Sequence, residues 1–207
     1  MQASAVDLAL ILAVDVSSSI DAGDYRLQMD GIAGALRDHE IQQAIAAGPF
    51  GAIALSLVQW STNASQATTL DWSVIGSAAQ AEGAAAAVEK ITRHWVPGGT
   101  GMAAAIQFCA QHFQSLPWQA THRVIDISGD GEDSEGGDVA GARANAVAAN
   151  ITINGLPIIS GSTTIEDYYA RRVIAGQNCF YVPATNIMAF HEAIRKKLLR
   201  EIELIAA

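Results

Sequence analysis

Apolar runs and segments with helical spacing take turns along this chain. The first apolar run, Leu8–Val14, is hydrophobic at every position, which is typical of a strand buried on both faces of a sheet. Tyr25, Met29, Ile32 and Leu36 then follow at the spacing of one helix face. The change of period predicts a buried strand followed by an amphipathic helix.

The same alternation continues to the C-terminal end. Further strands are predicted at Ile53–Trp60, Gln66–Trp72, Arg123–Ser128, Ile151–Ile158 and Cys179–Val182. Further helices are predicted at Ala78–Ile91, after Thr100, at Asp138–Asn150, at Ile165–Ala175 and from Ile187 to Ile205. The short connection 63–65 predicts a hairpin, and Pro157 marks the end of a strand or an edge. We therefore expect an α/β fold: a three-layer, doubly wound, Rossmann-like sheet, mostly parallel with one antiparallel edge strand.

Composition and charge narrow the possible partners. The chain has 207 residues, half of them hydrophobic, and this favours a single domain over residues 1–207. Its net charge of −9 argues against binding to nucleic acid or to an anionic membrane surface, because both need clustered basic residues. Its apolar runs are shorter than the roughly 20 residues that span a bilayer, so no membrane span is expected.

Three short polar segments stand where strands end or helices begin. Asp15, Ser17 and Ser19 follow the first strand, Thr100 precedes a helix, and Asp130 follows the strand Arg123–Ser128. In open α/β sheets, ligands bind where loops leave the carboxyl ends of the strands. Two carboxylates and three hydroxyls are hard oxygen ligands suited to Mg²⁺, with Mn²⁺ as an alternative and Ca²⁺ less favoured.

The neutral hydroxyls give this predicted site a particular character. Because only two of the five ligands carry charge, a bound cation keeps much of its positive charge. Some ligands are expected to contact the ion through water, which leaves one coordination position for an outside group. A carboxylate from a partner suits that position.

The five predicted ligands, from Asp15 to Asp130, resemble the metal-ion-dependent adhesion site (MIDAS) of von Willebrand factor A domains, in order and in spacing. More narrowly, the segments Arg123–Gly131, Thr152–Ile158 and Ala193–Leu198 resemble the bacterial family of domain of unknown function 1194. The resemblance covers nearly the whole chain. It implies the von Willebrand factor A fold, a bound divalent cation, and a protein ligand that presents a carboxylate.

The resemblance also implies a secretory leader. The residues before Leu8 lack the basic start and long apolar core of a signal peptide. We therefore expect a mature form located in the periplasm or secreted, with the cytoplasm as the alternative.

Two other functions remain open at this point. A Mg²⁺-dependent hydrolase or phosphatase needs a base or nucleophile near the ion, and Ser18, Glu132 and Asp133 are the nearby candidates. The chain has no phosphate-binding GxxxxGK[ST] loop and no Gly-x-Ser-x-Gly nucleophile elbow, so a non-enzymatic role is preferred. An accessory subunit of a chaperone or metal-insertion ATPase is the third hypothesis.

The remaining polar residues are expected to be structural. Glu132, Asp133 and Glu135 form a solvated loop in preference to a second cation site, although their charge would repel an acidic ligand. Cys109 and Cys179 are interpreted as small buried residues, with a disulfide as the alternative.

Three further groups have no assigned ligand. The basic cluster of Arg195–Lys197 and Arg200 matches the negative end of the last helix dipole. Asp126 lies inside a predicted strand and is expected to be structural, bonded to a neighbouring loop. Trp95 precedes the Gly98–Thr100 loop and is a candidate for shaping a binding surface, whereas the five histidines lack metal-ligand spacing.

Overall fold

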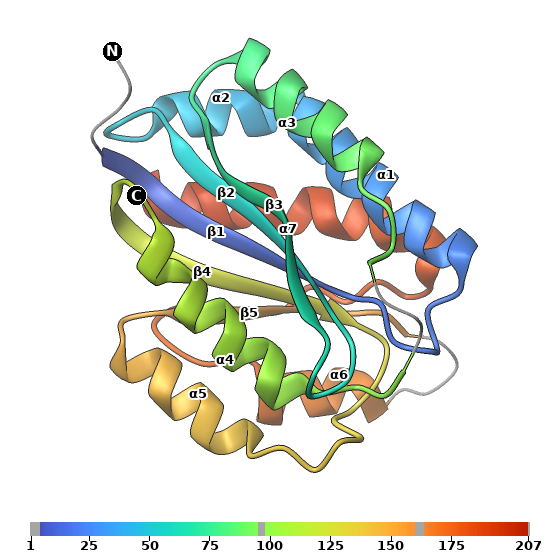
Figure 1. Cartoon of the computed structure of the whole chain (residues 1–207). Coiled ribbons are helices and arrows are strands. Elements are labelled where there is room, and N and C mark those ends of the chain that lie inside the picture. The colour runs from blue at the N-terminus through green and yellow to red at the C-terminus, as the bar shows by residue number, and fades with distance from the viewer. Residues whose placement is uncertain (1–4, 95–97, 160–163, 207) are drawn as a thin grey trace.

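A five-stranded sheet forms the middle layer of the molecule (Figure 1). The structure, a computed structural model, describes residues 5–94, 98–159 and 164–206. The strands are β1 (Ala5–Asp15), β2 (Ile53–Trp60), β3 (Gln66–Ile75), β4 (Gln119–Gly129) and β5 (Thr152–Pro157), in the order β3-β2-β1-β4-β5. All neighbours pair in parallel except β2 and β3, which form the predicted antiparallel hairpin. The predicted fold class is confirmed, and Pro157 both ends β5 and lies at an edge.

The central position of β1 explains its uniformly apolar sequence. β1 pairs with β2 on one side and β4 on the other, and its residues from Val6 onward are buried. The chain passes from β1 to β2, and later crosses over to β4 on the other side of β1. The strand order therefore reverses at β1, and the loops after β1 and β4 share the crevice that this reversal creates.

Helices cover both faces of the sheet (Figure 1). One face carries α1 (Ala22–Arg37), α2 (His39–Ala47), α3 (Ala78–Lys90) and α7 (Phe190–Ala206). The other face carries α4 (Met102–His112), α5 (Val139–Ala148) and α6 (Thr164–Tyr168), which continues as a π-helical turn over Tyr169–Val173. Short 3-10 turns lie at Phe113–Ser115 and Ile187–Ala189. Within the described ranges, no helix is both long and apolar enough to cross a bilayer.

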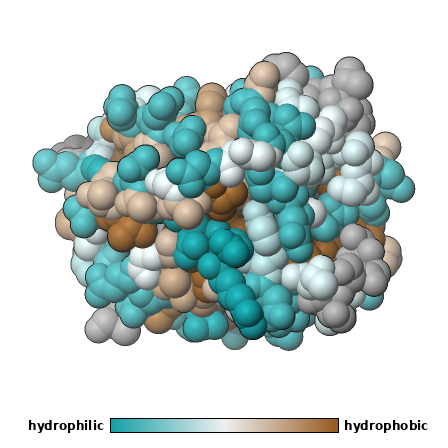
Figure 2. All heavy atoms as spheres, turned by 90° about the horizontal axis from the view of Figure 1, so that it is seen from below, coloured by the Kyte–Doolittle hydropathy of each residue, from teal (hydrophilic) through white to brown (hydrophobic). Residues whose placement is uncertain are grey.

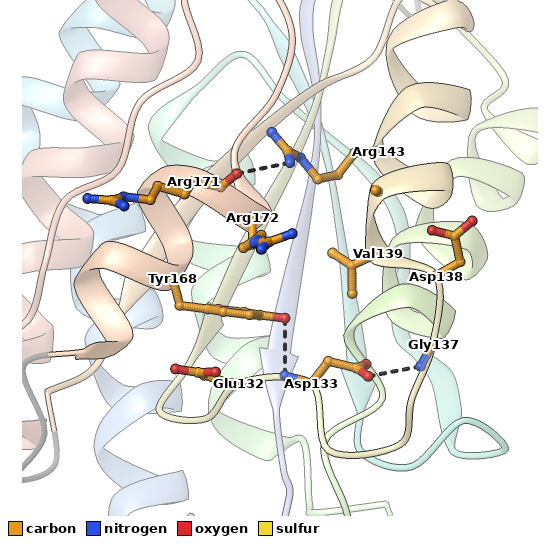
Figure 3. A pocket seen from close by; sticks show the side chains of 10 residues that line it. Glu132, Asp133, Gly137, Asp138, Val139, Arg143, Tyr168, Arg171 and Arg172 are labelled. Atoms are coloured by element: carbon orange, nitrogen blue, oxygen red, sulfur yellow. Dashed lines mark hydrogen bonds between the residues drawn. The ribbon is translucent and has the colours of Figure 1, made fainter.

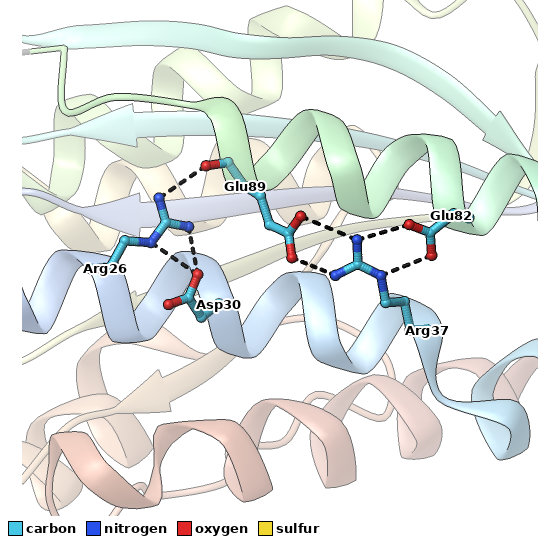
Figure 4. Close-up of polar contacts among 5 residues, drawn as sticks. All are labelled: Arg26, Asp30, Arg37, Glu82 and Glu89. Atoms are coloured by element: carbon cyan, nitrogen blue, oxygen red, sulfur yellow. Dashed lines mark hydrogen bonds and ion pairs between the residues drawn. The ribbon is translucent and has the colours of Figure 1, made fainter.

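Salt bridges hold α1 against α3 at the surface (Figure 4). The guanidinium of Arg37 on α1 lies between Glu82 and Glu89 of α3, with an Nε–Oε2 distance of 2.8 Å to Glu82. The hydrogen bonds from Arg37 hold the pKa of both glutamates below its ordinary value. Because these groups are exposed, the network adds little stability and mainly sets the position of α3.

The predicted strand over Cys179–Val182 is wrong. This segment runs beside β5 but makes only isolated bridges, Tyr181 with Gly155 and, further on, Ala184 with Ile158. Pro157 and Pro183 have no N–H group to donate to a ladder. In addition, the Phe180 N–H donates to the side chain of Asn154 at 2.9 Å, so it is not available for strand pairing.

The segment before Gly48 forms two helices, α1 and α2, a division that the hydrophobic periodicity did not predict. Asp38 adopts an extended conformation with φ −65° and ψ 128°, and this ends α1. Its carboxylate then accepts hydrogen bonds from the N–H groups of Glu40 and Ile41 at 2.8 Å and 3.4 Å. A single residue therefore terminates α1 and caps α2.

A buried ion triad joins β4 to α7, and it corrects the interpretation of the basic cluster. Arg195 and Lys196 are partly or fully exposed, but the side chain of Lys197 is completely buried. Its Nζ lies 2.6 Å from Asp126 Oδ1 and 2.6 Å from Glu201 Oε1. Lys197 is therefore a core residue, and Asp126 is structural as predicted, although its partner lies on a helix and not on a loop.

Candidate metal centre

The loop after β1 turns back on itself around the carboxylate of Asp15. Asp15 is the last residue of β1 and is completely buried. Its Oδ1 accepts a hydrogen bond of 2.7 Å from the N–H of Ser17. The side chain of Ser17 is buried, whereas Ser19 is exposed. The turn therefore places one hydroxyl inside the crevice and one at its mouth.

A hydrogen bond joins this loop to the end of β4. The Ser19 hydroxyl donates to Asp130 Oδ1 at 2.5 Å, and the Oγ atoms of Ser17 and Ser19 lie 3.2 Å apart. Asp130 also lies close enough to Asp15 for its charge to raise the pKa of that group. The crevice thus gathers four of the five predicted ligands.

Thr100 reaches the same place from the loop before α4. Its N–H donates to Ser134 Oγ at 2.9 Å, and its carbonyl accepts from the Ser134 N–H at 2.9 Å. A Cβ added to Gly131 would lie 3.2 Å from Thr100 Oγ1, so this hydroxyl packs directly against the turn that carries Asp130. The structure therefore brings all five predicted site residues together.

The electrostatics of the crevice fit a bound cation. Burial raises the pKa of Asp15 to about 7. The hydrogen bonds from Ser17 partly offset this rise, and the negative charge of Asp130 adds to it. Asp15 Oδ2 is buried with no hydrogen-bond partner within the described residues. An unpaired, desolvated carboxylate oxygen is costly unless a positive charge accompanies it. The hard oxygen atoms around Asp15 are a donor set that suits a small divalent ion.

Among the residues that the structure describes, no carboxylate-rich site competes with this crevice. The parts of the chain that the structure describes contain no group of three or more His, Cys, Asp or Glu side chains that could hold a metal ion. Asp133 is instead a structural residue of its loop, since its carboxylate accepts hydrogen bonds of 2.9 Å from the N–H groups of Met102 and Gly137. Glu132 and Glu135 are exposed.

Sequence reasoning missed two residues that support the site. Arg93 donates through one terminal nitrogen to the carbonyl oxygens of Val16 and Ser17, at 2.6 Å and 2.7 Å, and so holds the first loop in place. Tyr169 is completely buried, and desolvation together with the charge of Asp15 raises its pKa well above the ordinary value. No local pattern distinguishes either residue, because each acts through a contact distant in sequence.

Other sequence-based candidates lie elsewhere or take structural roles. Trp95 lies outside the described residues. Cys109 and Cys179 are both free thiols, so the structure contains no disulfide between them. Among the histidines, His112 makes a hydrogen bond of 2.9 Å with Ser56 and stacks on Trp72, with ring centroids 5.1 Å apart.

Comparison with known families identifies the family of this chain. The family described as protein of unknown function, DUF1194, matches residues 5–206 of the chain. The chain belongs to the DUF1194 family. The predicted resemblance is therefore confirmed at the level of the family. A comparison with curated protein sequences found no match.

Solved structures similar to this DUF1194 protein include von Willebrand factor A domains. Proximal thread matrix protein 1 from the mussel byssus has a TM-score of 0.66 at 14% identity, covering 99% of this chain and 46% of that chain. A von Willebrand factor type A protein from Catenulispora acidiphila has a TM-score of 0.65 at 15% identity, covering 95% and 43% respectively. BatB from Bacteroides thetaiotaomicron has a TM-score of 0.56 at 20% identity, covering 94% and 98%.

These comparisons establish the fold. This DUF1194 protein spans less than half the length of the mussel and Catenulispora proteins. Another structure of the mussel protein, with a TM-score of 0.62 at 13% identity, is described as having a zinc-occupied MIDAS motif. The chain therefore has the von Willebrand factor A fold.

Proposed function

We propose that this DUF1194 protein is a binding module that captures an acidic side chain of a protein partner through a divalent cation. Asp15, Ser17, Ser19, Thr100 and Asp130 hold the ion in this proposal. Mg²⁺ or Mn²⁺ suits the site better than Ca²⁺, which takes more oxygen ligands. The carboxylate of the partner completes the coordination. The proposed location is the periplasm or the cell exterior.

The observation that carries the proposal is the unsatisfied carboxylate oxygen at the centre of the crevice. Asp15 Oδ2 has no partner within the described residues, although the side chain is completely buried. The groups that act on the pKa of Asp15 are those of Ser17 and Asp130, and neither residue carries a positive charge. A cation would satisfy this oxygen, and its remaining positive charge would attract an anionic ligand.

The zinc-occupied MIDAS motif of the mussel protein supports a cation at the corresponding place in this fold. It does not identify the ion that this chain prefers. The proposed choice of Mg²⁺ or Mn²⁺ rests on the oxygen-only donor set, because Zn²⁺ is more often held by nitrogen and sulfur ligands.

An enzymatic role has less support from the geometry. Catalysis of hydrolysis needs a free base or nucleophile near the ion. Asp133, one of the three candidates, uses both carboxylate oxygens to hold the N–H groups of Met102 and Gly137. Asp133 is therefore not available as a base, and binding without chemistry remains the proposed function.

Titration calorimetry with Mg²⁺ and Mn²⁺ tests the proposal directly. Asp130→Ala should abolish ion binding while the far-ultraviolet circular dichroism stays unchanged. Asp167→Ala serves as a matched control, since it removes an exposed carboxylate from α6. A pull-down from the envelope fraction, with and without EDTA, then tests partner capture. Capture that survives both EDTA and Asp130→Ala contradicts the proposal.

A further inference from the structure

The hydroxyl of Tyr169 lies beside the carboxylate of Asp15. A Cβ added to Gly129, the last residue of β4, would lie 2.7 Å from Asp15 Oδ2 and 3.0 Å from the Tyr169 hydroxyl. Both side chains are completely buried. The two oxygen atoms therefore flank the same point at the end of β4, although Asp15 comes from β1 and Tyr169 from the turn that continues α6.

Neither of these two oxygen atoms has a hydrogen-bond partner within the described residues, so they also do not bond directly to each other. A carboxylate oxygen accepts hydrogen bonds, and the hydroxyl of a tyrosine is a donor that is neutral at pH 7. Burying an unpaired hydroxyl is unfavourable, and a phenylalanine at position 169 would avoid that cost. One unpaired donor and one unpaired acceptor thus share the same desolvated space.

Two glycines make room for Tyr169. A Cβ on Gly155 of β5 would lie 2.6 Å from Tyr169 Cδ1, and a Cβ on Gly129 would fill the space next to the hydroxyl. Tyr169 also begins the π-helical turn Tyr169–Val173, an irregularity that is frequent at functional sites. The glycines and the turn together allow the phenol ring to approach the strands closely enough to reach Asp15.

The surroundings of the Tyr169 ring are apolar. Tyr169 belongs to the hydrophobic cluster between the sheet and the helices α4 and α5. Seen from below in Figure 2, the face that carries α5 has its most hydrophilic side chains near the centre, at the surface of this layer. Because Tyr169 is completely buried, bulk water does not solvate its hydroxyl. Only an ordered, internal partner can therefore satisfy this group.

The neighbouring tyrosine reaches the other side of the metal centre. The hydroxyl of Tyr168 accepts a hydrogen bond of 3.1 Å from the N–H of Asp133, in the loop that follows Asp130 (Figure 3). Tyr169 lies beside Asp15 instead. Two consecutive tyrosines thus approach two different loops of the site, and within the described residues only Tyr168 has a partner for its hydroxyl.

We propose that Tyr169 is a positioning residue of the metal centre, and that one buried water joins its hydroxyl to Asp15 Oδ2. The water accepts a hydrogen bond from Tyr169 and donates one to Asp15. A carboxylate oxygen has two lone pairs, so Oδ2 keeps one of them for the cation, and a neutral water does not replace the positive charge. The bridge holds the carboxylate in a fixed orientation toward the ion. The inference rests on the proposed function.

Tyr169→Phe removes the hydroxyl alone and keeps the ring in its place. Titration calorimetry should show Mn²⁺ affinity falling roughly tenfold, as expected when a group that orients a metal ligand is lost. Tyr25→Phe is the matched control, because Tyr25 is also buried but belongs to the cluster on the other face of the sheet. Its hydroxyl donates to the Ile91 carbonyl at 3.1 Å. Tyr25→Phe should therefore lower the urea midpoint but change Mn²⁺ affinity less than about twofold.

Crystals grown in EDTA test the bridge without the ion. The wild type should show an ordered water within about 3.2 Å of both Asp15 Oδ2 and the Tyr169 hydroxyl. Crystals of Tyr169→Phe should lack this water, since one of its two partners is gone. A role of Tyr169 in packing alone predicts neither this water nor a change in ion affinity.

Separate outcomes address Tyr169 and the metal-dependent function. Absence of the water from the wild-type crystals would overturn the bridge, and so would equal Mn²⁺ affinity in Tyr169→Phe and the wild type. An equal loss of affinity in Tyr25→Phe would assign the effect to general loosening of the fold and also overturn it. If the wild type binds neither Mg²⁺ nor Mn²⁺, the proposed function fails together with the positioning role. If the wild type and Tyr169→Phe bind Mn²⁺ equally well, only the role of Tyr169 fails.

Discussion

The hydroxyl of Ser19 donates a 2.5 Å hydrogen bond to Asp130 Oδ1, joining residues 111 positions apart in the sequence. This contact links the loop after β1 to the end of β4 across the crevice where the strand order reverses. It places a neutral hydroxyl directly beside a carboxylate that is a proposed metal ligand. Because Ser19 is exposed, it can be changed with little effect on the core.

Ser19→Ala should weaken Mn²⁺ and Mg²⁺ binding roughly tenfold, because it removes one proposed ligand and also the hydrogen bond with which Ser19 orients Asp130. Ser18→Ala is the matched control: Ser18 is the exposed neighbour, and it is tied to Gly98 through its backbone N–H and not its side chain. Titration calorimetry measures both variants. Equal affinity in the two variants would exclude Ser19 as a ligand.

The buried carboxylate of Asp15 predicts an unusual dependence of stability on pH. Its pKa is raised from 3.8 to about 7, so the ion-free folded protein holds a proton that the unfolded chain releases near pH 4. The contribution of Asp15 to stability is therefore largest at low pH and falls as pH rises from about 4 to 7, by at most ~4 kcal/mol.

Asp15→Asn should abolish this pH-dependent loss, since an amide does not ionise. In EDTA, urea denaturation should show the variant to be more stable than the wild type near pH 8 and similar at about pH 3, below both pKa values of Asp15. Adding Mn²⁺ near pH 8 should stabilise the wild type alone. Parallel pH profiles for the two proteins would refute the assignment of the raised pKa to Asp15.

The five candidate ligands could be predicted because each depends on local sequence. A buried strand that ends on Asp15, and glycines around Thr100 and Asp130, mark strand ends and tight turns. Parallel strands bring such ends to one edge of the sheet, so the topology supplies the long-range part. The strands and the hairpin could also be predicted, because the apolar runs and the short connection that indicate them are local features of the sequence.

The failures arose where a tertiary contact overrides the local pattern. Lys197 and Glu201 lie at positions i and i+4 on the inner face of α7, between the buried Ile194 and Ile202. Their charge favoured a surface location, yet Lys197 pairs with both Glu201 and Asp126, and this allows the three side chains to be buried. Nothing near Lys197 in the sequence reveals a carboxylate on β4.

Lys197→Met should strongly destabilise the protein, because it leaves the carboxylates of Asp126 and Glu201 buried without a counter-charge. Breaking one member of a buried pair typically costs ~3–5 kcal/mol. Lys196→Met, a fully comparable change at the exposed neighbour, should change stability by less than about 0.5 kcal/mol. Combining Lys197→Met with Asp126→Asn should recover part of the loss. Urea denaturation distinguishes these outcomes, and equal stability of the two single variants would contradict the role of the triad.

The close packing around Asp15 predicts opposite effects for two glycine substitutions. A Cβ on Gly129 would lie 2.7 Å from Asp15 Oδ2 and 3.0 Å from the Tyr169 hydroxyl. Both atoms belong to completely buried side chains that have little room to move. Gly129→Ala should therefore destabilise the fold by ~1–3 kcal/mol and weaken ion binding.

Gly83, on the exposed side of α3, provides the control. A Cβ there meets no atom within 4 Å, and the residue lies inside a helix. Gly83→Ala should therefore stabilise the protein by ~0.5–1 kcal/mol without changing ion affinity. Thermal denaturation and Mn²⁺ titration measure both effects. If Gly129→Ala binds Mn²⁺ as tightly as Gly83→Ala does, the carboxylate of Asp15 is not part of the ion site.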